Sequence, residues 1–292
     1  AIYESLLDYT PRITTGFEEV EGREYRPGQF MLDPHGSERK TTGSYYTNPD
    51  LIAELIKSAL DPVIADRLSR AGPDPAAREK ALLSIRVCDP ACGSGAFLIA
   101  ASNRLGREVA KIRAGTELPS AAEVQAARRD VLSHCIYGVD LNPMAVELAK
   151  VSLWINALVG DKPLSFLDHH IRCGNSLIGA TPELIAGGIP DDAYTPVEGD
   201  SKDVARRIKA ANKEQRQTRT FEEFSPRSTV LEACARRFAA LADASEDDPD
   251  SVEAKKAEYQ QLITSSEYAK ERLSADCWCA AFFWPLDAEH AG

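Results

Sequence analysis

A glycine-containing string between an apolar strand and an apolar helix most constrains the fold of this chain. The string Asp-Pro-Ala-Cys-Gly-Ser-Gly-Ala-Phe occupies residues 89–97. Residues 84–89 predict a buried strand, and the apolar pattern from Gly95 to about Ala114 predicts a helix. Gly93 and Gly95 lack a Cβ, so the backbone can turn sharply and a ligand can approach closely. Strand, glycine turn and helix N-terminus together predict a nucleotide-type cofactor site.

The residue at the strand end indicates the charge of the cofactor. Asp89 suits a positively charged ligand rather than a pyrophosphate, and S-adenosylmethionine carries both an amino group and a sulfonium. A dinucleotide fingerprint would need a small residue three positions after Gly95, where this chain has Leu98. The alternative is a glycine turn with a purely structural role.

Two further predicted strands end in polar residues. The string Cys-Ile-Tyr-Gly-Val-Asp at 135–140 predicts a second strand, followed by a helix that begins near Pro143. A carboxylate at the end of such a strand can accept hydrogen bonds from both ribose hydroxyls, which makes Asp140 a candidate ribose ligand. The alternative is that Asp140 caps the following helix. Residues 169–177 predict a third strand and turn, and their two histidines lack a third ligand at metal spacing, so no metal site is predicted.

Four strings of this chain resemble motifs of the N6-adenine DNA methyltransferases. Residues 89–97 resemble motif I, and Gly-Val-Asp-Leu-Asn-Pro at 138–143 resembles motif II. Gly-Asn-Ser-Leu at 174–177 resembles motif III, and Gly-Ser-Tyr-Tyr-Thr-Asn-Pro at 43–49 resembles motif X with Asn48 inserted. Along the chain, motif X precedes motif I and the expected place of the catalytic motif, which is the order of the γ group of these enzymes. The best match is to the large single-chain methylases of restriction–modification and of BREX- or DISARM-like phage defence.

The resemblance implies an α/β, doubly wound, Rossmann-like S-adenosylmethionine-dependent methyltransferase fold with a helical insertion. It also implies that Asp140 binds the ribose, that Leu141 packs on the adenine, and that the residues of motif III bond its edge. Motif X would line the methionine half of the cofactor. The predicted cofactor-binding residues are Tyr46, Thr47, Asp89, Pro90, Ala91, Cys92, Gly93, Gly95, Asp140, Leu141, Asn175 and Ser176.

The catalytic motif of that family, Asn/Asp-Pro-Pro-aromatic, does not occur in the 292 residues. Its two Asn-Pro pairs, Asn48-Pro49 and Asn142-Pro143, are followed by Asp and Met. The apolar string at 275–284 is similar to the segment before the motif in related large methylases, and it predicts a buried helix packed on the sheet. We therefore expect the cofactor-binding part of a methyltransferase, without a catalytic residue and inactive alone.

The pattern of apolar and turn-forming residues predicts four parts. These are an N-terminal arm at 1–40, the methyltransferase core at 41–180, a mostly helical insertion at 181–275, and a return to the core at 276–292. The arm is predicted to be irregular, with one short helix at 2–9. Further expected features are helices at 51–68 and 121–132, a loop at 181–200, two or three helices at 201–275, and an acidic turn between them at 246–250.

The net charge of −11 predicts that this stretch by itself binds DNA poorly, because phosphate neutralisation supplies most of the affinity. DNA is therefore expected to be held through regions outside it, with other defence-system subunits as further partners. The charged insertion predicts a solvated face, or else a docking arm for a partner or for the DNA backbone. The seven cysteines lack a C-x-x-C pair, which indicates a reduced cytoplasmic compartment.

Two other functions remain open at this point. One is a methyltransferase for a protein glutamine or an RNA base. The other is a non-catalytic scaffold subunit of a defence complex. No membrane association is predicted, because no apolar run approaches the roughly 20 residues that span a bilayer.

Overall fold

The computed structural model describes residues 10–20, 22–33, 47–160, 162–218, 225–287 and 289. The helix predicted at 2–9 lies outside these residues. The chain divides into two compact units, one made of 1–176 with 245–253 and the other of 177–244 with 254–292. The four-part division predicted from the sequence stays a prediction.

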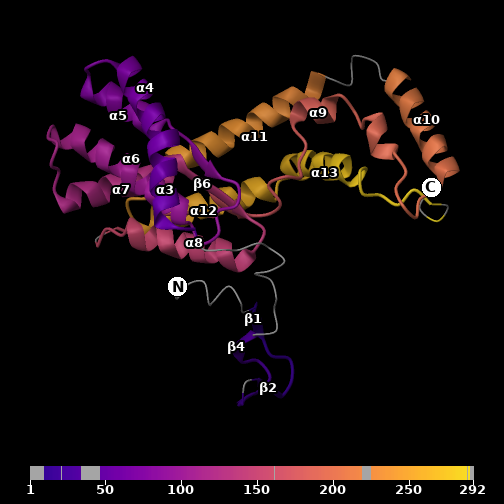
Figure 1. The fold of residues 1–292 in the computed structure, drawn as a ribbon, viewed down its shortest axis with the longest axis horizontal. Helices are drawn as coiled ribbons and strands as arrows, with labels where there is room; N and C mark the ends of the chain where they lie inside the picture. The colour runs from indigo at the N-terminus through magenta and orange to yellow at the C-terminus, as the bar shows by residue number, and fades with distance from the viewer. Residues whose placement is uncertain are drawn as a thin grey trace. The chain divides into compact units, whose positions relative to one another are not determined.

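A parallel sheet forms the centre of the first unit (Figure 1). Its strands are β5 (Val87–Asp89), β6 (Ile136–Asp140) and β7 (Ile171–Cys173), with β6 in the middle. Asp89 lies in register with Gly138, and Asp140 with Cys173. Because the strands are parallel, their carboxyl ends meet at one edge of the sheet. The predicted α/β class is confirmed, and so are the three strands.

Four of the described helices flank this sheet, and three of them begin at a side-chain cap. The helices are α5 (Pro75–Leu83), α6 (Ala96–Ala114), α7 (Ala121–Cys135) and α8 (Pro143–Asn156). Ser120 and Glu123 form a reciprocal capping box at the start of α7. Asn142 caps α8 by accepting hydrogen bonds from the N–H groups of Met144 and Ala145. The helices predicted at 95–114, at 121–132 and after Pro143 are confirmed.

The helix predicted over 51–68 is also confirmed, with a π-helical turn inside it. It comprises α3 (Pro49–Leu55), η1 (Ile56–Leu60) and α4 (Asp61–Ala71). Asn48 Oδ1 accepts a 2.8 Å hydrogen bond from the backbone N–H of Asp50, as expected for the cap. Pro62 at the start of α4 has no N–H to donate, which is a common cause of such a break in the helical hydrogen-bond pattern.

The core of the first unit lies between the sheet and these helices. It is built from small and branched apolar side chains at helical spacing, which allows α6 and α7 to pack closely. Its fully buried members include Leu98, Leu105, Val109, Val131, Leu132, Ile136, Leu153, Leu167 and Ile171.

Residues 10–33 form two antiparallel strand pairs, so the prediction of an irregular arm was wrong for this segment. The pairs are β1 (Thr10–Ile13) with β4 (Phe30–Asp33), and β2 (Glu18–Val20) with β3 (Arg23–Tyr25). Arg12 pairs with Glu18 and, at 2.8 Å, with Asp33. Strands of three or four residues are too short for a visible alternation, and the ion pair between Arg12 and Asp33 joins residues 21 positions apart in the sequence.

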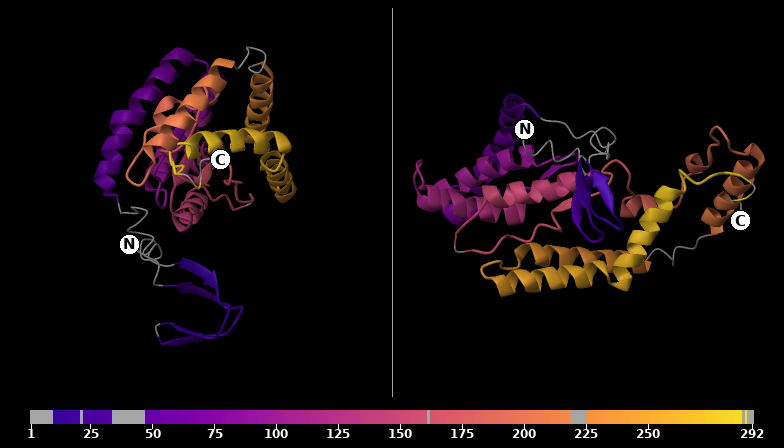
Figure 2. Two further views of the ribbon diagram at one scale, coloured as in Figure 1. Left: turned by 90° about the vertical axis from the view of Figure 1, so that its right-hand side faces the viewer. Right: turned by 90° about the horizontal axis from the view of Figure 1, so that it is seen from below.

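The second unit is mainly helical. Its elements are α9 (Pro182–Ala186), η2 (Asp191–Tyr194), α10 (Lys202–Thr218), α11 (Ser225–Asp243), α12 (Pro249–Ile263), whose first residues group with the first unit, and α13 (Ser266–Ala280). Helices α11 and α12 run side by side (Figure 2), and Arg237 of α11 lies 2.7 Å from Glu258 of α12.

Two predictions for this region were wrong. The expected loop at 181–200 contains α9 and η2, because Thr181 caps a turn that begins with Pro182. Residues 201–275 contain α10, α11, α12 and most of α13, which is one helix more than expected. The additional helix begins because Ser265 accepts a hydrogen bond from the N–H of Tyr268.

The apolar string at 275–284 is not a buried helix, which corrects a further prediction. Helix α13 ends at Ala280 and has no buried residue. Beyond it, Phe283 is 70% exposed and Trp284 is 55% exposed. The apolar residues of the string continue past the end of the helix, so they cannot share one buried helical face.

The acidic turn between α11 and α12 is confirmed as a turn, but its first carboxylate is buried. Glu246 is 8% exposed and accepts hydrogen bonds from Ser133 Oγ at 3.0 Å and from the N–H of Phe166 at 3.2 Å. Arg129 donates to the backbone carbonyl of Glu246 at 2.7 Å. The turn is thus packed into the first unit.

Candidate cofactor site

The turn after β5 has the backbone that its two glycines permit. Gly93 and Gly95 have φ values of +51° and +89°, a region that side chains disfavour. The N–H of Cys92 donates to the carbonyl of Val139 at 2.9 Å, which ties the turn to β6. Gly95 is the N-cap of α6 and supplies no side-chain acceptor. The first N–H groups of α6 therefore remain available to a ligand.

Gly138, for which the sequence predicted no role, allows this turn to pack on the sheet. A Cβ at Gly138 would lie 2.8 Å from Leu98 Cδ1 and 3.0 Å from Cys92 Sγ. At Gly95 a Cβ would lie at an ordinary contact distance of 3.4 Å from the Cα of Ala149, so its φ of +89° is what favours glycine there. A glycine at the middle of the second strand was the available signal, because it marks close packing or a bulge.

Asp140 joins the glycine turn to the turn after β6. Its carboxylate is 6% exposed and accepts a 2.8 Å hydrogen bond from the N–H of Gly93 and another of 2.8 Å from the N–H of Asn142. The cap of α8 is Asn142, so the alternative that Asp140 caps this helix was wrong. A carboxylate has about four acceptor positions, so two remain for ligand hydroxyls.

Asp89, at the end of the neighbouring strand, has an acceptor that the protein leaves unused. Its Oδ1 accepts a 3.1 Å hydrogen bond from the N–H of Ala91. Its Oδ2 is buried and has no hydrogen-bond partner. Burial, with a smaller contribution from Asp140, raises the pKa of Asp89 above its usual value. A buried carboxylate oxygen without a donor fits a ligand that brings an N–H or a positive charge.

The thiol of Cys92 lies beneath the turn and is expected to be unreactive. It is 5% exposed, and burial raises its pKa to about 12, with Asp140 as the next contributor. A thiol in this state packs as a small apolar group and does not act as a nucleophile.

The end of β7 completes the edge on which these residues lie. The N–H of Gly174 donates to the carbonyl of Asp140 at 2.9 Å, so motif III begins beside motif II. Leu141 is 50% exposed, and Asn175 and Ser176 are also exposed. Residues of the predicted motifs I, II and III are thus brought to one edge of the sheet. Their roles toward a cofactor stay predictions.

The structure gives no cofactor role to the two predicted residues of motif X. Tyr46 lies outside the described residues, and Thr47 is half-buried just before the cap of α3. The two Asn-Pro pairs both open helices: Asn48 caps α3, and Asn142 caps α8. Both asparagine side chains therefore already accept backbone hydrogen bonds.

Among the described residues, no group of three or more His, Cys, Asp or Glu side chains is arranged to hold a metal ion. The same part of the chain contains no helix long and apolar enough to cross a membrane. All seven cysteines are free thiols.

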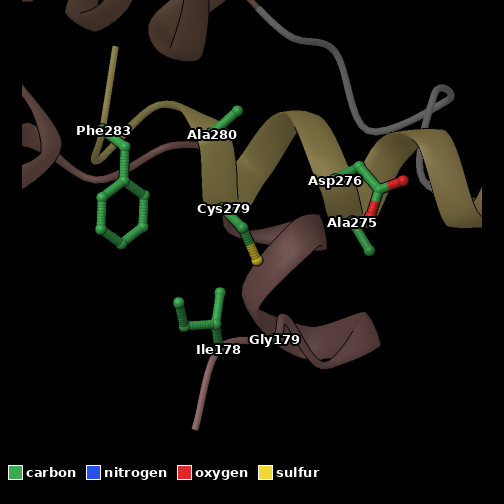
Figure 3. A pocket seen from close by; sticks show the side chains of 7 residues that line it. All are labelled: Ile178, Gly179, Ala275, Asp276, Cys279, Ala280 and Phe283. Carbon is green, nitrogen blue, oxygen red and sulfur yellow. The ribbon is translucent and has the colours of Figure 1, made fainter. Parts of the chain in front are cut away.

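A separate, mostly apolar cavity of about 370 Å³ lies in the second unit (Figure 3). Ile178 and Gly179 form one side, and the end of α13 with Phe283 forms the other. Its one carboxylate, Asp276, lies 3.6 Å from Arg272. None of the predicted cofactor-binding residues lines this cavity.

Two protein-family models match the chain. Residues 76–174 match the DNA-methyltransferase domain of MmeI, and residues 134–272 match the Eco57I restriction-modification methylase. The first match spans the sheet edge with Asp89, Asp140 and Gly174, and the second extends into the helices of the second unit.

Two curated relatives carry related names. A protein of Methanocaldococcus jannaschii named as a type II restriction enzyme and methyltransferase is 28% identical over 214 residues, covering 59% of this chain and 18% of that protein. The adenine-specific methyltransferase PglX of Streptomyces coelicolor is 29% identical over 195 residues, covering 63% of this chain and 14% of PglX. The chain thus spans less than a fifth of either relative. No solved structure matches significantly. Together the matches support a methyltransferase of the restriction–modification type.

Proposed function

We propose that this chain is the S-adenosylmethionine-binding part of a site-specific DNA methyltransferase that modifies adenine at N6, in restriction–modification or phage defence. Both family matches support the methyltransferase class, and the name of PglX supports adenine. In this proposal the three-stranded parallel sheet is half of a doubly wound, Rossmann-like sheet, and the full protein works in the cytoplasm on DNA.

The observation that carries the proposal is the pair of acids at the carboxyl ends of β5 and β6. Asp140 is held rigidly by two backbone N–H groups and keeps acceptor capacity for a diol. Asp89 has a buried oxygen without a donor, which fits the cationic part of S-adenosylmethionine. A dinucleotide would instead bring a pyrophosphate, which the carboxylate of Asp89 beside the glycine turn would repel.

Each remaining residue has a role in this proposal. Gly93 and Gly95 give the cofactor room to approach the backbone, with Pro90, Ala91 and Cys92 forming the rest of the turn. Leu141 supplies an apolar face for the adenine, and Asn175 and Ser176 supply polar groups for its edge. Tyr46 and Thr47 would close over the methionine half.

When bound, the cofactor supplies an electrophilic methyl group on a sulfonium. Asp89, Asp140 and the glycine turn would hold the cofactor, and its methyl group would be the one transferred to the target amine. The residues described here bind and orient the cofactor. Because the 292 residues contain no Asn-Pro-Pro-aromatic motif and both Asn-Pro pairs serve as helix caps, we propose that this stretch alone binds the cofactor without turnover.

Calorimetric titration with S-adenosylmethionine tests the proposal. The chain should bind saturably, and Asp140→Ala should weaken binding by about tenfold or more, which corresponds to roughly 1.4 kcal/mol. The matched control is Asp66→Ala, which removes an exposed carboxylate that pairs with Arg70 on α4. It should leave the affinity unchanged.

Asp140 also holds the turn in place, so a second variant separates binding from folding. Asp89→Asn keeps the acceptor for the N–H of Ala91 and removes only the charge. It should fold as the wild type and bind the cofactor more weakly. A chain that binds no S-adenosylmethionine, or that binds equally well in both variants, would refute the proposed function.

A further inference from the structure

Helix α10 (Lys202–Thr218) carries a stripe of positive charge on a chain that is acidic overall. Six Lys and Arg stand against two acids in this helix, whereas the whole chain has a net charge of −11. Five of the six recur at intervals of three and four residues, which places them on one face of the helix. We name this set the α10 stripe; it consists of Lys202, Arg206, Lys209, Lys213 and Arg216.

One side of α10, next to the stripe, is packed within the second unit. Ala205 is 2% exposed, and the N–H of Ser201 just before the helix donates to the carbonyl of Leu286 at 2.8 Å. Asn212 Nδ2 donates to the carbonyl of Ile189 at 3.0 Å. On the helical wheel, Ala205 and Asn212 lie about 60° and about 80° from the centre of the stripe, so the packed side borders the stripe. Lys202, Arg206 and Lys213 are exposed. Lys209 and Arg216 are half-buried, on the side of the stripe nearer the packed residues.

The charges of the stripe are only partly neutralised by the protein. Arg216 pairs with Asp191, and Arg206 lies 3.5 Å from Asp203 at an exposed site, where such a pair is weak. Lys202, Lys209 and Lys213 form no ion pair with a carboxylate among the described residues. Three cations in a row along about 16 Å of helix, at about 1.5 Å per residue, are therefore available to a partner.

We propose that the α10 stripe contacts the phosphate backbone of duplex DNA. A linear array of cations complements a polyanion whose phosphates follow one another every 3.4 Å or so along each strand. The choice of DNA rests on the proposed function. The helix would add sequence-independent contacts that position the duplex, since phosphate contacts carry no base information. Part of the DNA contact would then lie within this chain, and not only in regions outside it.

The test compares two triple variants that change the net charge equally. The stripe variant is Lys202→Gln with Lys209→Gln and Lys213→Gln. The control is Arg67→Gln with Lys80→Gln and Lys270→Gln, three exposed cations on other helices. Binding of the full chain to a fluorescent duplex of about 20 base pairs is measured by anisotropy between about 50 and 200 mM salt.

At about 50 mM salt, the stripe variant should bind the duplex at least about tenfold more weakly than wild type. The slope of log K against log salt should fall by about 2 to 3, since each phosphate contact contributes about 0.9. The control should match the wild type. Equal losses in both variants, no loss in the stripe variant, no binding by wild type, or a preference for single-stranded RNA would each overturn the inference.

Titration of the same variants with S-adenosylmethionine separates this inference from the proposed function. The stripe variant should keep wild-type affinity for the cofactor. A wild-type chain that binds the cofactor but not the duplex refutes the stripe alone. A chain that binds the duplex through the stripe but does not bind the cofactor refutes the proposed function alone.

Discussion

Asp89 and Asp140 end neighbouring strands but have different surroundings. Asp140 accepts backbone hydrogen bonds on both oxygens, whereas Asp89 uses one oxygen and buries the other without a donor. Burial penalises the charged form of Asp89 and raises its pKa. The protein itself therefore stabilises the carboxylate of Asp140, whereas a cationic ligand would stabilise that of Asp89.

The raised pKa of Asp89 predicts opposite pH effects on cofactor binding and on stability. As pH falls through this pKa, Asp89 takes up a proton and loses its attraction for a cation, so affinity for S-adenosylmethionine should fall. The folded state binds this proton more tightly than the unfolded state, so the unliganded chain should gain stability from Asp89 over the same interval. Calorimetry and urea unfolding at several pH values measure the two effects. Asp89→Asn should show neither contribution, and a variant that keeps both would contradict this prediction.

Gly138→Ala tests the close packing beneath the glycine turn. The added methyl group would meet Leu98 and Cys92 at distances of 2.8–3.0 Å, so side chains or backbone must shift. We expect the free energy of unfolding to fall by about 1–3 kcal/mol, as for other overpacked cores. Urea denaturation measures it. Gly160→Ala is the matched control, because nothing lies within 4 Å of its new Cβ; equal stability of the two variants would argue against this account.

At the level of elements, the turn between α11 and α12 shows how a polar segment can belong to a core. Glu246 is buried against the end of α7 and the segment before β7, where Ser133 and the N–H of Phe166 donate to it. Lys162 lies 2.7 Å from Asp247 and adds a second contact nearer the surface. The turn is therefore fastened by specific hydrogen bonds.

Glu246→Ala should destabilise the first unit. It removes an acceptor from two buried donors, and each donor left unsatisfied costs about 1–3 kcal/mol. We expect a total loss of about 2–4 kcal/mol in the free energy of unfolding, measured by urea denaturation. Asp250→Ala, an exposed acid in the same acidic cluster, should lose only a few tenths of a kcal/mol. A loss in Asp250→Ala as large as that in Glu246→Ala would show that the buried bonds are not the cause.

The sequence predicted those elements whose signals are local. The capping box at Ser120, the cap at Asn142 and the glycines around Cys92 lie within a few residues of the elements that they start. The strands at 10–33 were missed because Arg12 finds Asp33 only after the chain returns. The burial of Glu246 was missed for the same reason, since its donors are more than 75 residues away in the chain.

The candidate site was predictable to the same extent. The motif strings located the acids and glycines at one sheet edge, because strand ends in a parallel sheet must meet there. They did not reveal that Asp140 bonds the N–H of Gly93, or that Gly138 makes room for Cys92. Such contacts join turns 40 to 50 residues apart, and only the folded chain brings them together.

At the scale of the whole molecule, the two proposed ligands fall in different compact units. The cofactor site lies in the first unit and the α10 stripe in the second. Amide hydrogen exchange should therefore slow around 91–97 and 138–142 with S-adenosylmethionine, and around 202–216 with duplex DNA. At a ligand concentration of about 100 times Kd, the protected sites should gain up to about 2.7 kcal/mol. Protection by the cofactor centred on 202–216 would contradict both assignments.

Because the thiol of Cys92 is buried beneath the glycine turn, its reactivity reports whether that turn is open or closed. With its pKa raised to about 12 and its sulfur shielded, Cys92 should resist alkylating reagents, while the exposed Cys173 and Cys277 react readily. Alkylation of Cys92 then requires the turn to lift away from β6. The rate of that alkylation, followed by peptide mass spectrometry, would thus record the opening of the turn in an unlabelled chain.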